Sequence, residues 1–158
     1  FSLLSDGSAA TNGINSTSPS PDEAENILNK KSGLQTISGM APDFREIEAA
    51  SYGENENAAI AIEKFKYEIA AFVAKYAVAM NGVDVIAFAG GVGERGYETR
   101  ERICKYLEFL GVKLDLEKNA TKGEELLIST ADSKIKVYVI PTNEELMIAR
   151  DTVEKISE

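Results

Sequence analysis

Apolar side chains recur every three or four residues between Asn55 and Met80, and this is the strongest helical pattern in the chain. The repeated positions are Ile62, Phe65, Ile69, Phe72, Tyr76 and Met80. This spacing places them along one side of an α-helix, so we expect a long helix that ends at Asn81-Gly82. We expect its apolar stripe to pack in the core of the protein.

Shorter helices and strands are expected on both sides of this helix. Pro21 and Pro42 mark the starts of two short helices, because proline fits the first turn of a helix. The apolar runs at residues 83–89 and 135–140 predict two buried strands. The remaining expected elements are a turn over residues 32–39, helices over 97–110 and 143–156, and weaker strands over 112–114 and 126–129.

This order of elements is typical of an α/β fold. We expect right-handed crossovers and a mainly parallel or mixed sheet that is flanked by helices. Residues 1–20 are rich in Ser, Thr, Asn and Gly, so we expect a loop or tail there. Residues 21–158 then form a single domain, as the length of the chain suggests.

The charge and composition of the chain limit its possible partners and chemistry. The formal net charge is −9, which repels phosphate backbones and makes nucleic acid an unexpected partner. The chain contains no His, so it cannot assemble a Ser–His or Cys–His nucleophile on its own. No apolar run approaches the ~20 residues of a membrane span, so no membrane contact is expected. The lone Cys104 cannot form an internal disulfide, which is compatible with a cytoplasmic protein.

The first candidate site follows the strand at residues 83–89. Gly90, Gly91 and Gly93 leave backbone amides accessible just ahead of a helix, where aligned N–H groups favour an anion such as phosphate. The alternative is a tight turn that needs glycine only for its backbone angles, and spacing alone does not separate the two. The segment from Gly91 also matches G-x-G-x-x-G, with Asp115 about twenty residues on. A dinucleotide-binding, Rossmann-like module is therefore a second interpretation.

The second candidate site follows the strand at residues 135–140. Thr142 or Asn143 can cap the next helix, and acidic residues favour its first turn for electrostatic reasons. A carboxylate at the end of a strand, near a phosphate-binding loop, is also well placed to hold Mg²⁺. Taken alone, the residues favour the capping interpretation.

The third candidate site is the segment Asp43-Phe44-Arg45. An aspartate can accept a hydrogen bond from a ribose hydroxyl, and an arginine can stack on a purine ring. The simpler interpretation is that Asp43 lies in the first turn of a helix and Arg45 lies on its solvent side. Taken alone, the residues favour this simpler interpretation.

These segments occur together in an order that resembles the acetate kinase family from about Pro21 to Ile156. The matching stretches are residues 29–34 (NKKSGL), 43–45 (DFR), 88–94 (FAGGVGE), 107–111 (LEFLG), 128–130 (IST) and 139–146 (VIPTNEEL). The resemblance implies the fold of the acetate and sugar kinase, Hsp70 and actin superfamily. It also implies reversible phosphoryl transfer between ATP and acetate, which gives ADP and acetyl phosphate.

The resemblance also assigns roles to residues of this chain. It implies that Asp43, Phe44 and Arg45 contact the adenosine of the nucleotide and that Glu144 binds Mg²⁺. The implied nucleotide-binding turn consists of Gly90, Gly91, Val92, Gly93, Glu94 and Arg95. The family usually has Asn where this chain has Arg95, so only the backbone contacts of the turn carry over directly.

The resemblance further implies a homodimer, with part of the helix from Asn55 to Met80 facing the partner. The family's acetate pocket and its catalytic arginines, aspartate and histidines lie upstream of the matching region. We therefore expect no catalytic residue in this chain, no kinase activity from the chain alone and an open edge on its sheet. A propionate or butyrate kinase is an alternative, because the pocket that selects the acid also lies upstream.

Overall fold

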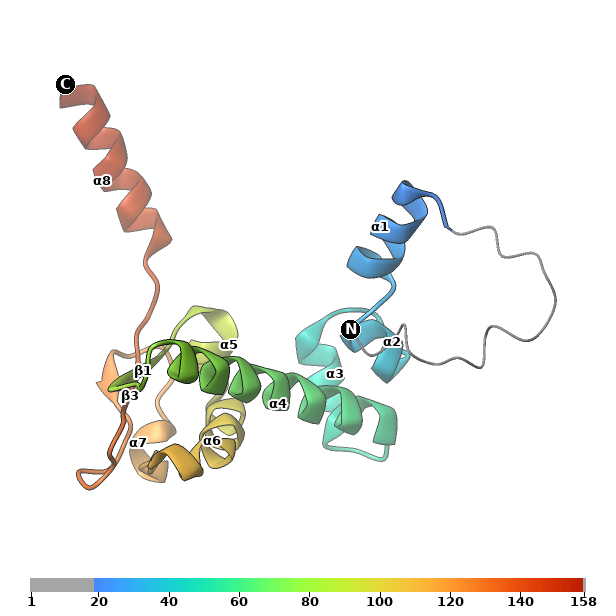
Figure 1. The fold of residues 1–158 in the computed structure, drawn as a ribbon. Coiled ribbons are helices and arrows are strands. Elements are labelled where there is room, and N and C mark those ends of the chain that lie inside the picture. The colour runs from blue at the N-terminus through green and yellow to red at the C-terminus, as the bar shows by residue number, and fades with distance from the viewer. Residues whose placement is uncertain (1–18, 158) are drawn as a thin grey trace.

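A computed structural model describes residues 19–157 of the chain (Figure 1). Its longest helix, α4 (Glu56–Ala79), joins two groups of elements. The first group contains the short helices α1 (Pro21–Lys30), α2 (Leu34–Ser38) and α3 (Phe44–Ser51). The second group contains β1 (Val85–Phe88), α5 (Gly90–Arg95), α6 (Tyr97–Tyr106), η3 (Glu108–Leu110), α7 (Leu116–Asn119), β2 (Leu126–Leu127), β3 (Lys136–Val139) and α8 (Glu144–Ser157).

Side-chain caps and positive backbone angles decide where the predicted helices begin and end. Ser20 and Glu23 form a capping box at the start of α1, in which each side chain accepts a hydrogen bond from the backbone of the other. Asn55 caps α4 by accepting a hydrogen bond from the Ala58 amide at 3.0 Å. Asn81 and Gly82 follow α4 with φ angles of 57° and 135°, which stop the helix where its sequence predicts.

The strands form a three-stranded sheet in the order β1-β3-β2. β1 and β3 are parallel, with Val85 opposite Lys136 and Phe88 opposite Val139. β2 is antiparallel to β3, so the sheet is mixed, and the expected α/β class is confirmed. The weak strand expected over residues 112–114 is reduced to one isolated bridge between Leu114 and Ser129.

Two separate clusters of buried side chains form the core. The larger cluster lies between the sheet, α6 and the second half of α4, and the smaller one joins α2 and α3 to the first half of α4. The larger cluster includes Ala70, Ile86, Phe88, Ile103, Cys104, Leu107, Val112, Ile128, Ile135, Val137 and Val139. The smaller one is built on Ile47, Ala58, Ala61 and Ile62. The long helix therefore connects the two halves of the core.

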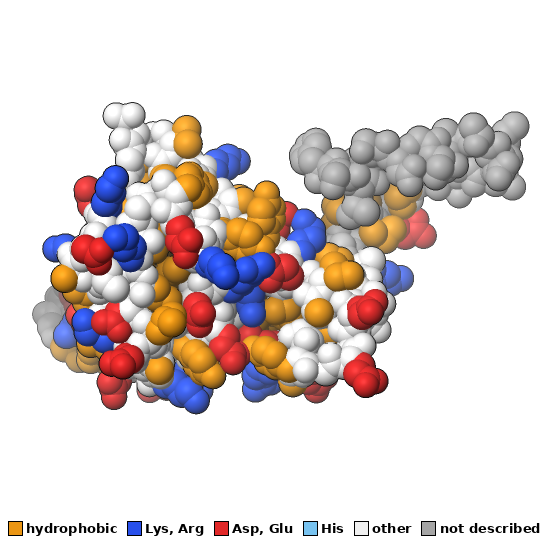
Figure 2. Space-filling view, turned by 90° about the horizontal axis from the view of Figure 1, so that it is seen from below, with side chains coloured by type: hydrophobic (Ala, Val, Ile, Leu, Met, Phe, Trp, Pro, Cys, Tyr) orange, Lys and Arg blue, Asp and Glu red, His pale blue; other side chains and the backbone are white. Residues whose placement is uncertain are grey.

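The apolar stripe of α4 is not buried along its whole length. Ile62 is 3% exposed, but Phe72 is 53% exposed, and Tyr76 and Met80 are each 62% exposed. In this second half, α4 packs against the larger core cluster through Ala70, with Ile69 and Val73 beside it. The expected packing of the stripe in the core therefore holds only for its first part, because periodicity identifies residues that share a face but not the neighbour that the face meets. In Figure 2, hydrophobic side chains are exposed among charges of both signs.

Two further local predictions differ from the structure, whereas the helix expected over residues 143–156 is present as α8. The segment at residues 32–39 contains the short helix α2 rather than only a turn. The helix expected over residues 97–110 ends at Tyr106, and η3 follows it before Gly111 reverses the chain with a φ of 94°. α8 buries none of its residues and extends away from the sheet (Figure 1). Within residues 19–157, no helix combines the length and the apolar character needed to cross a membrane.

Candidate functional site

The glycine-rich turn after β1 is a short helix, α5, and not the open loop that its sequence suggests. Gly90 has a φ of 69°, a left-handed conformation that lets the chain turn sharply out of the strand. α5 and α6 are separated only by Gly96, so the chain passes from one helix directly into the next. The expected order of strand, glycine turn and helix is confirmed, although the turn itself is helical.

The fold does not require all glycines of this turn to the same degree. A Cβ on Gly93 would lie 3.2 Å from the backbone carbon of Phe88, and a Cβ on Gly96 would lie 2.6 Å from the Val92 carbonyl oxygen. Gly91, in contrast, lies outside the left-handed region, and a Cβ there would meet no atom within 4 Å. Backbone angles and close packing therefore account for the other glycines but leave Gly91 unexplained.

The Glu94 carboxylate connects the glycine turn to the loop after β3. Its Oε1 accepts hydrogen bonds from the Gly90 amide at 3.0 Å, the Thr142 amide at 2.8 Å and the Thr142 hydroxyl at 2.9 Å. These bonds hold the pKa of Glu94 below its ordinary value, and the bond from the Thr142 amide has the largest effect. Because β1 and β3 are parallel neighbours, both candidate loops lie at the same edge of the sheet. The sequence did not reveal that Glu94 connects them.

The loop after β3 presents Glu144 at the start of α8. Asn143 caps this helix by accepting a hydrogen bond from the Leu146 amide at 3.0 Å, while Glu144 is exposed. Among residues 19–157, no three His, Cys, Asp or Glu side chains gather into a metal-binding group. A single exposed carboxylate fits Mg²⁺, which often takes one or two protein carboxylates and fills its other positions with water and phosphate oxygens.

Asp43 and Arg45 interact with each other at the start of α3. Asp43 accepts hydrogen bonds from the Arg45 amide and guanidinium, each at 2.9 Å. These bonds lower the pKa of Asp43 to about 2, and the bond from the guanidinium has the largest effect. The Arg45 side chain is 87% exposed. Phe44 instead packs inward on Phe65, with the ring centroids 4.9 Å apart. Asp43 therefore caps α3, and Arg45 lies on its solvent side, as the simpler interpretation expects for Arg45.

Contacts from later residues of α3 place this helix beside the start of α6. The Thr99 hydroxyl donates to the Glu48 carboxylate at 3.0 Å, and the Tyr52 hydroxyl donates to Glu98. The buried ammonium of Lys66 lies 4.0 Å from the same Glu48 carboxylate. The helix that carries the third candidate segment is therefore attached to the helix that follows the glycine turn.

The dinucleotide-binding interpretation does not fit the structure. Asp115 caps α7, where it accepts a hydrogen bond from the Lys118 amide at 3.1 Å and pairs with the Lys118 ammonium at 2.9 Å. Within the described residues, the segment before Asp115 supplies no strand beside β1, whose partner in the sheet is β3. The aspartate therefore does not end a strand next to the glycine turn, as that fingerprint requires.

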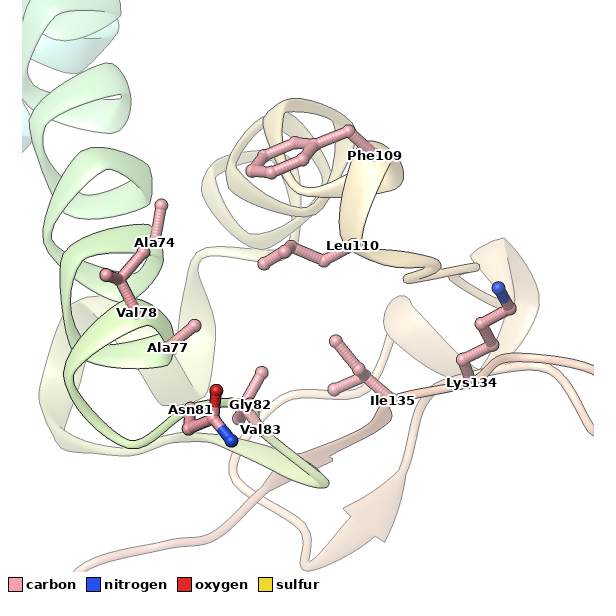
Figure 3. Close-up of a pocket in the computed structure, with 10 residues that line it drawn as sticks. All are labelled: Ala74, Ala77, Val78, Asn81, Gly82, Val83, Phe109, Leu110, Lys134 and Ile135. Carbon is pink, nitrogen blue, oxygen red and sulfur yellow. The ribbon is translucent and has the colours of Figure 1, made fainter.

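A largely apolar pocket of about 580 Å³ lies at the other end of the strands. In Figure 3, Ala74 and Val78 of α4 lie on the left, Phe109 and Leu110 lie toward the top, and Ile135 lies below Leu110. Val83 and Lys134, which also line it, precede β1 and β3. The pocket thus lies at the amino ends of the strands, away from both candidate loops.

Comparisons with known proteins agree on one family. The family model described as the acetokinase family matches residues 11–150. An acetate kinase from Lachnoclostridium phytofermentans is 53% identical over 135 residues, which cover 85% of this chain and 34% of the relative. An acetate kinase from Thermoanaerobacterium thermosaccharolyticum is 55% identical over 140 residues, which cover 88% of this chain and 35% of the relative. The family match starts before residue 21, and the domain boundary placed there stays a prediction.

Solved structures agree with this result. A crystal structure of Porphyromonas gingivalis acetate kinase superimposes with a TM-score of 0.79 at 45% identity and covers 85% of this chain and 34% of that protein. A propionate kinase from Francisella tularensis superimposes with a TM-score of 0.73 at 40% identity and covers 82% of this chain and 33% of that protein. This chain thus spans about a third of the length of the proteins that it matches. On the sequence match and the shared fold together, the chain belongs to the acetokinase family.

Proposed function

We propose that this chain is the nucleotide-binding portion of an acetate kinase, which transfers phosphate reversibly between ATP and acetate to give ADP and acetyl phosphate. Relatives with that name share about half of the aligned residues with this chain. The observation that carries the assignment of the site is Gly91, a glycine that the fold does not need. A glycine without a structural reason is expected where a ligand must approach the backbone closely.

The phosphates of the nucleotide bind at the turn from Gly90 to Arg95. The first amides of any helix have no partner within the helix and attract anions. The Gly90 amide is occupied by the Glu94 carboxylate, which leaves the amides of Gly91 and Val92 for phosphate oxygens. Gly93 packs so closely on β1 that the position has no room for a side chain. The exposed Arg95 adds a positive charge at the end of the turn.

The adenosine binds at the start of α3. The exposed guanidinium of Arg45 stacks on the purine, and Asp43 accepts a hydrogen bond from the ribose. Their mutual ion pair is exposed, so it is opened easily when the nucleotide competes for either partner. Phe44 supports both by anchoring α3 on Phe65.

Glu144 would hold Mg²⁺, which often needs only one or two protein carboxylates. The ion would supply positive charge against the phosphoryl groups of the nucleotide. The bonds from Thr142 to Glu94 fix the position of the loop that carries Glu144 relative to the glycine turn. The two loops therefore act as one unit toward the nucleotide.

The resemblance to the family implies that the acetate site and the groups that stabilise phosphoryl transfer lie outside the matching region, and this chain covers only 34% of one such relative. The chain by itself is therefore inactive as a kinase, because transfer needs both positioning and charge stabilisation around the phosphoryl group. Propionate is a second candidate acid, since a propionate kinase shares the fold at 40% identity. The complete protein acts in the cytoplasm as a homodimer, for which the exposed Phe72, Tyr76 and Met80 of α4 offer an apolar contact face.

Isothermal titration of the full 158-residue chain with ADP–Mg²⁺ and with NAD tests this function. We expect measurable binding of ADP–Mg²⁺ and weaker or no binding of NAD. A preference for NAD contradicts the kinase assignment. In a parallel assay with ATP, Mg²⁺ and acetate we expect no acetyl phosphate, and formation of acetyl phosphate at ordinary turnover would refute the inactivity of the isolated chain.

A further inference from the structure

Arg100 of α6 is a completely buried arginine beneath the glycine turn. Its exposed fraction is 0%, and it is the largest fully buried side chain of the described residues. The guanidinium donates through Nη1 to the Gly93 carbonyl at 2.7 Å and through Nε to the Asn119 amide oxygen at 2.9 Å. Nη2 donates to the Thr121 carbonyl at 2.9 Å and to the Asn119 carbonyl.

None of these four acceptors carries a charge. Within residues 19–157, no carboxylate forms an ion pair with Arg100. Burial lowers the pKa of Arg100, but an ordinary arginine titrates so far above neutral pH that the guanidinium stays protonated. A buried cation without a counter-ion is unfavourable, so an anion that comes close to it is strongly attracted.

The network around Arg100 holds the inner, carbonyl side of the glycine turn. Arg100 binds the Gly93 carbonyl, and the Gly123 amide donates to the Glu94 carbonyl at 3.2 Å. Asn119 completes the network by donating to the Tyr97 carbonyl at 2.8 Å. The carbonyl and amide of a trans peptide point in opposite directions. The Gly93 and Glu94 carbonyls share their peptide planes with the amides of Glu94 and Arg95, so these contacts fix the second half of α5. The preceding amides of Gly91 and Val92 belong to the same short helix and are held in place with it.

We propose that Arg100 is a positioning residue for nucleotide phosphates. It fixes the orientation of the glycine turn through Gly93, and its buried positive charge attracts the phosphates that bind on the other side. A chain with a net charge of −9 needs such a local source of positive potential to hold a polyanion. This role depends on the nucleotide-binding function proposed above, so the tests separate the two.

The first test compares ligands with and without phosphate on the full chain. In Arg100→Lys, we expect ADP–Mg²⁺ to bind at least tenfold more weakly, while the affinity for adenosine changes less than twofold. The matched control is Arg102→Lys on the same helix, because Arg102 pairs with Glu63 and Tyr106 instead of the glycine turn. Equal weakening of ADP–Mg²⁺ and adenosine would show a purely structural role and overturn the inference.

The second test separates the charge of Arg100 from its contacts. Asn119→Asp places a carboxylate of the same shape against the guanidinium, so the hydrogen bond to Nε is kept while the positive charge is neutralised. The bond from the Asn119 amide to the Tyr97 carbonyl is lost, so Asn119→Ala, which loses that bond without adding a charge, is the control. In Asn119→Asp, we expect at least threefold weaker binding of ADP–Mg²⁺ and unchanged binding of adenosine. ADP–Mg²⁺ affinity equal to that of the unmodified chain would refute the electrostatic part of the role.

A third test needs no ligand and therefore does not depend on the proposed function. Amide hydrogen exchange by NMR reports the order of the turn from Gly91 to Arg95. We expect these amides to exchange at least tenfold faster in Arg100→Lys than in Arg102→Lys, with both variants folded by circular dichroism. Unchanged exchange contradicts the positioning role. If the unmodified chain binds neither ADP–Mg²⁺ nor adenosine, the proposed function fails, and the exchange rates still decide whether Arg100 holds the turn.

Discussion

Replacing Gly91 with alanine should change stability and nucleotide binding in opposite directions. A Cβ at this position meets no atom within 4 Å, and the backbone is not left-handed, so the fold accepts it without strain. Alanine is favoured over glycine in a helix by about 0.5–1 kcal/mol. Because α5 has only six residues, we expect the lower end of this range, about 0.5 kcal/mol. This corresponds to a rise of roughly 1–2 °C in the melting temperature.

The same methyl group occupies the space through which phosphate oxygens reach the amides of Gly91 and Val92. We expect Gly91→Ala to bind ADP–Mg²⁺ at least tenfold more weakly, which equals a loss of about 1.4 kcal/mol. The assays are thermal unfolding by circular dichroism and isothermal titration with ADP–Mg²⁺. Both use the full chain.

Gly96→Ala is the matched control for the structural requirement. Its Cβ would lie 2.6 Å from the Val92 carbonyl oxygen, so we expect a destabilisation of about 1–3 kcal/mol. If Gly91→Ala is destabilised as much as Gly96→Ala, Gly91 is needed only for the fold. If Gly91→Ala is stable and binds ADP–Mg²⁺ normally, the phosphates do not approach Gly91, and the proposed site is wrong.

Three other predictions follow from individual side chains. The folded-state pKa of Glu94 is lowered by its bonds to Thr142, so the Thr142 amide resonance should be constant above the ordinary glutamate pKa and shift as pH falls through the folded value. Glu94→Gln should show no such transition. Burial raises the pKa of Cys104 to about 12, so its thiol should resist an aromatic disulfide reagent at pH 8 until the chain unfolds. Rapid labelling of the folded chain would contradict its burial. Leu107→Ala empties a fully buried position and should cost about 2–5 kcal/mol, whereas Phe109→Ala, at a 73% exposed position, should cost far less. Equal losses in chemical denaturation would argue against the described core.

Much of the local structure was predictable because it depends on residues that are close together in the chain. The capping box at Ser20, the cap at Asn55 and the stop at Gly82 act within one turn of a helix. The strands β1 and β3 were recognisable as short apolar runs between turn residues. The candidate site was found through its resemblance to a family, since Asp43, Glu144 and the glycine turn each have a simple structural explanation when taken alone.

The contacts that shape the candidate site were not predictable in this way. Thr142 and Glu94 are 48 positions apart, and Arg100 and Thr121 are 21 positions apart. Nothing in the local sequence distinguishes Glu94 from an ordinary exposed glutamate or Arg100 from an arginine on the solvent side of a helix. Their partners become neighbours only when β1 and β3 pair and α6 folds back onto the segment around Asn119.

The sequence by itself determined where α1 and α4 begin, where α4 ends, that β1 and β3 are strands and which family the pattern resembles, because these features depend on local backbone preferences and on the spacing of apolar residues. Tertiary structure alone decided that α4 packs through Ala70 rather than Phe72, that Gly91 is free of structural constraint and that Arg100 lies buried beneath the glycine turn. Burial and long-range hydrogen bonds depend on which surfaces meet, and one-dimensional spacing does not specify those surfaces.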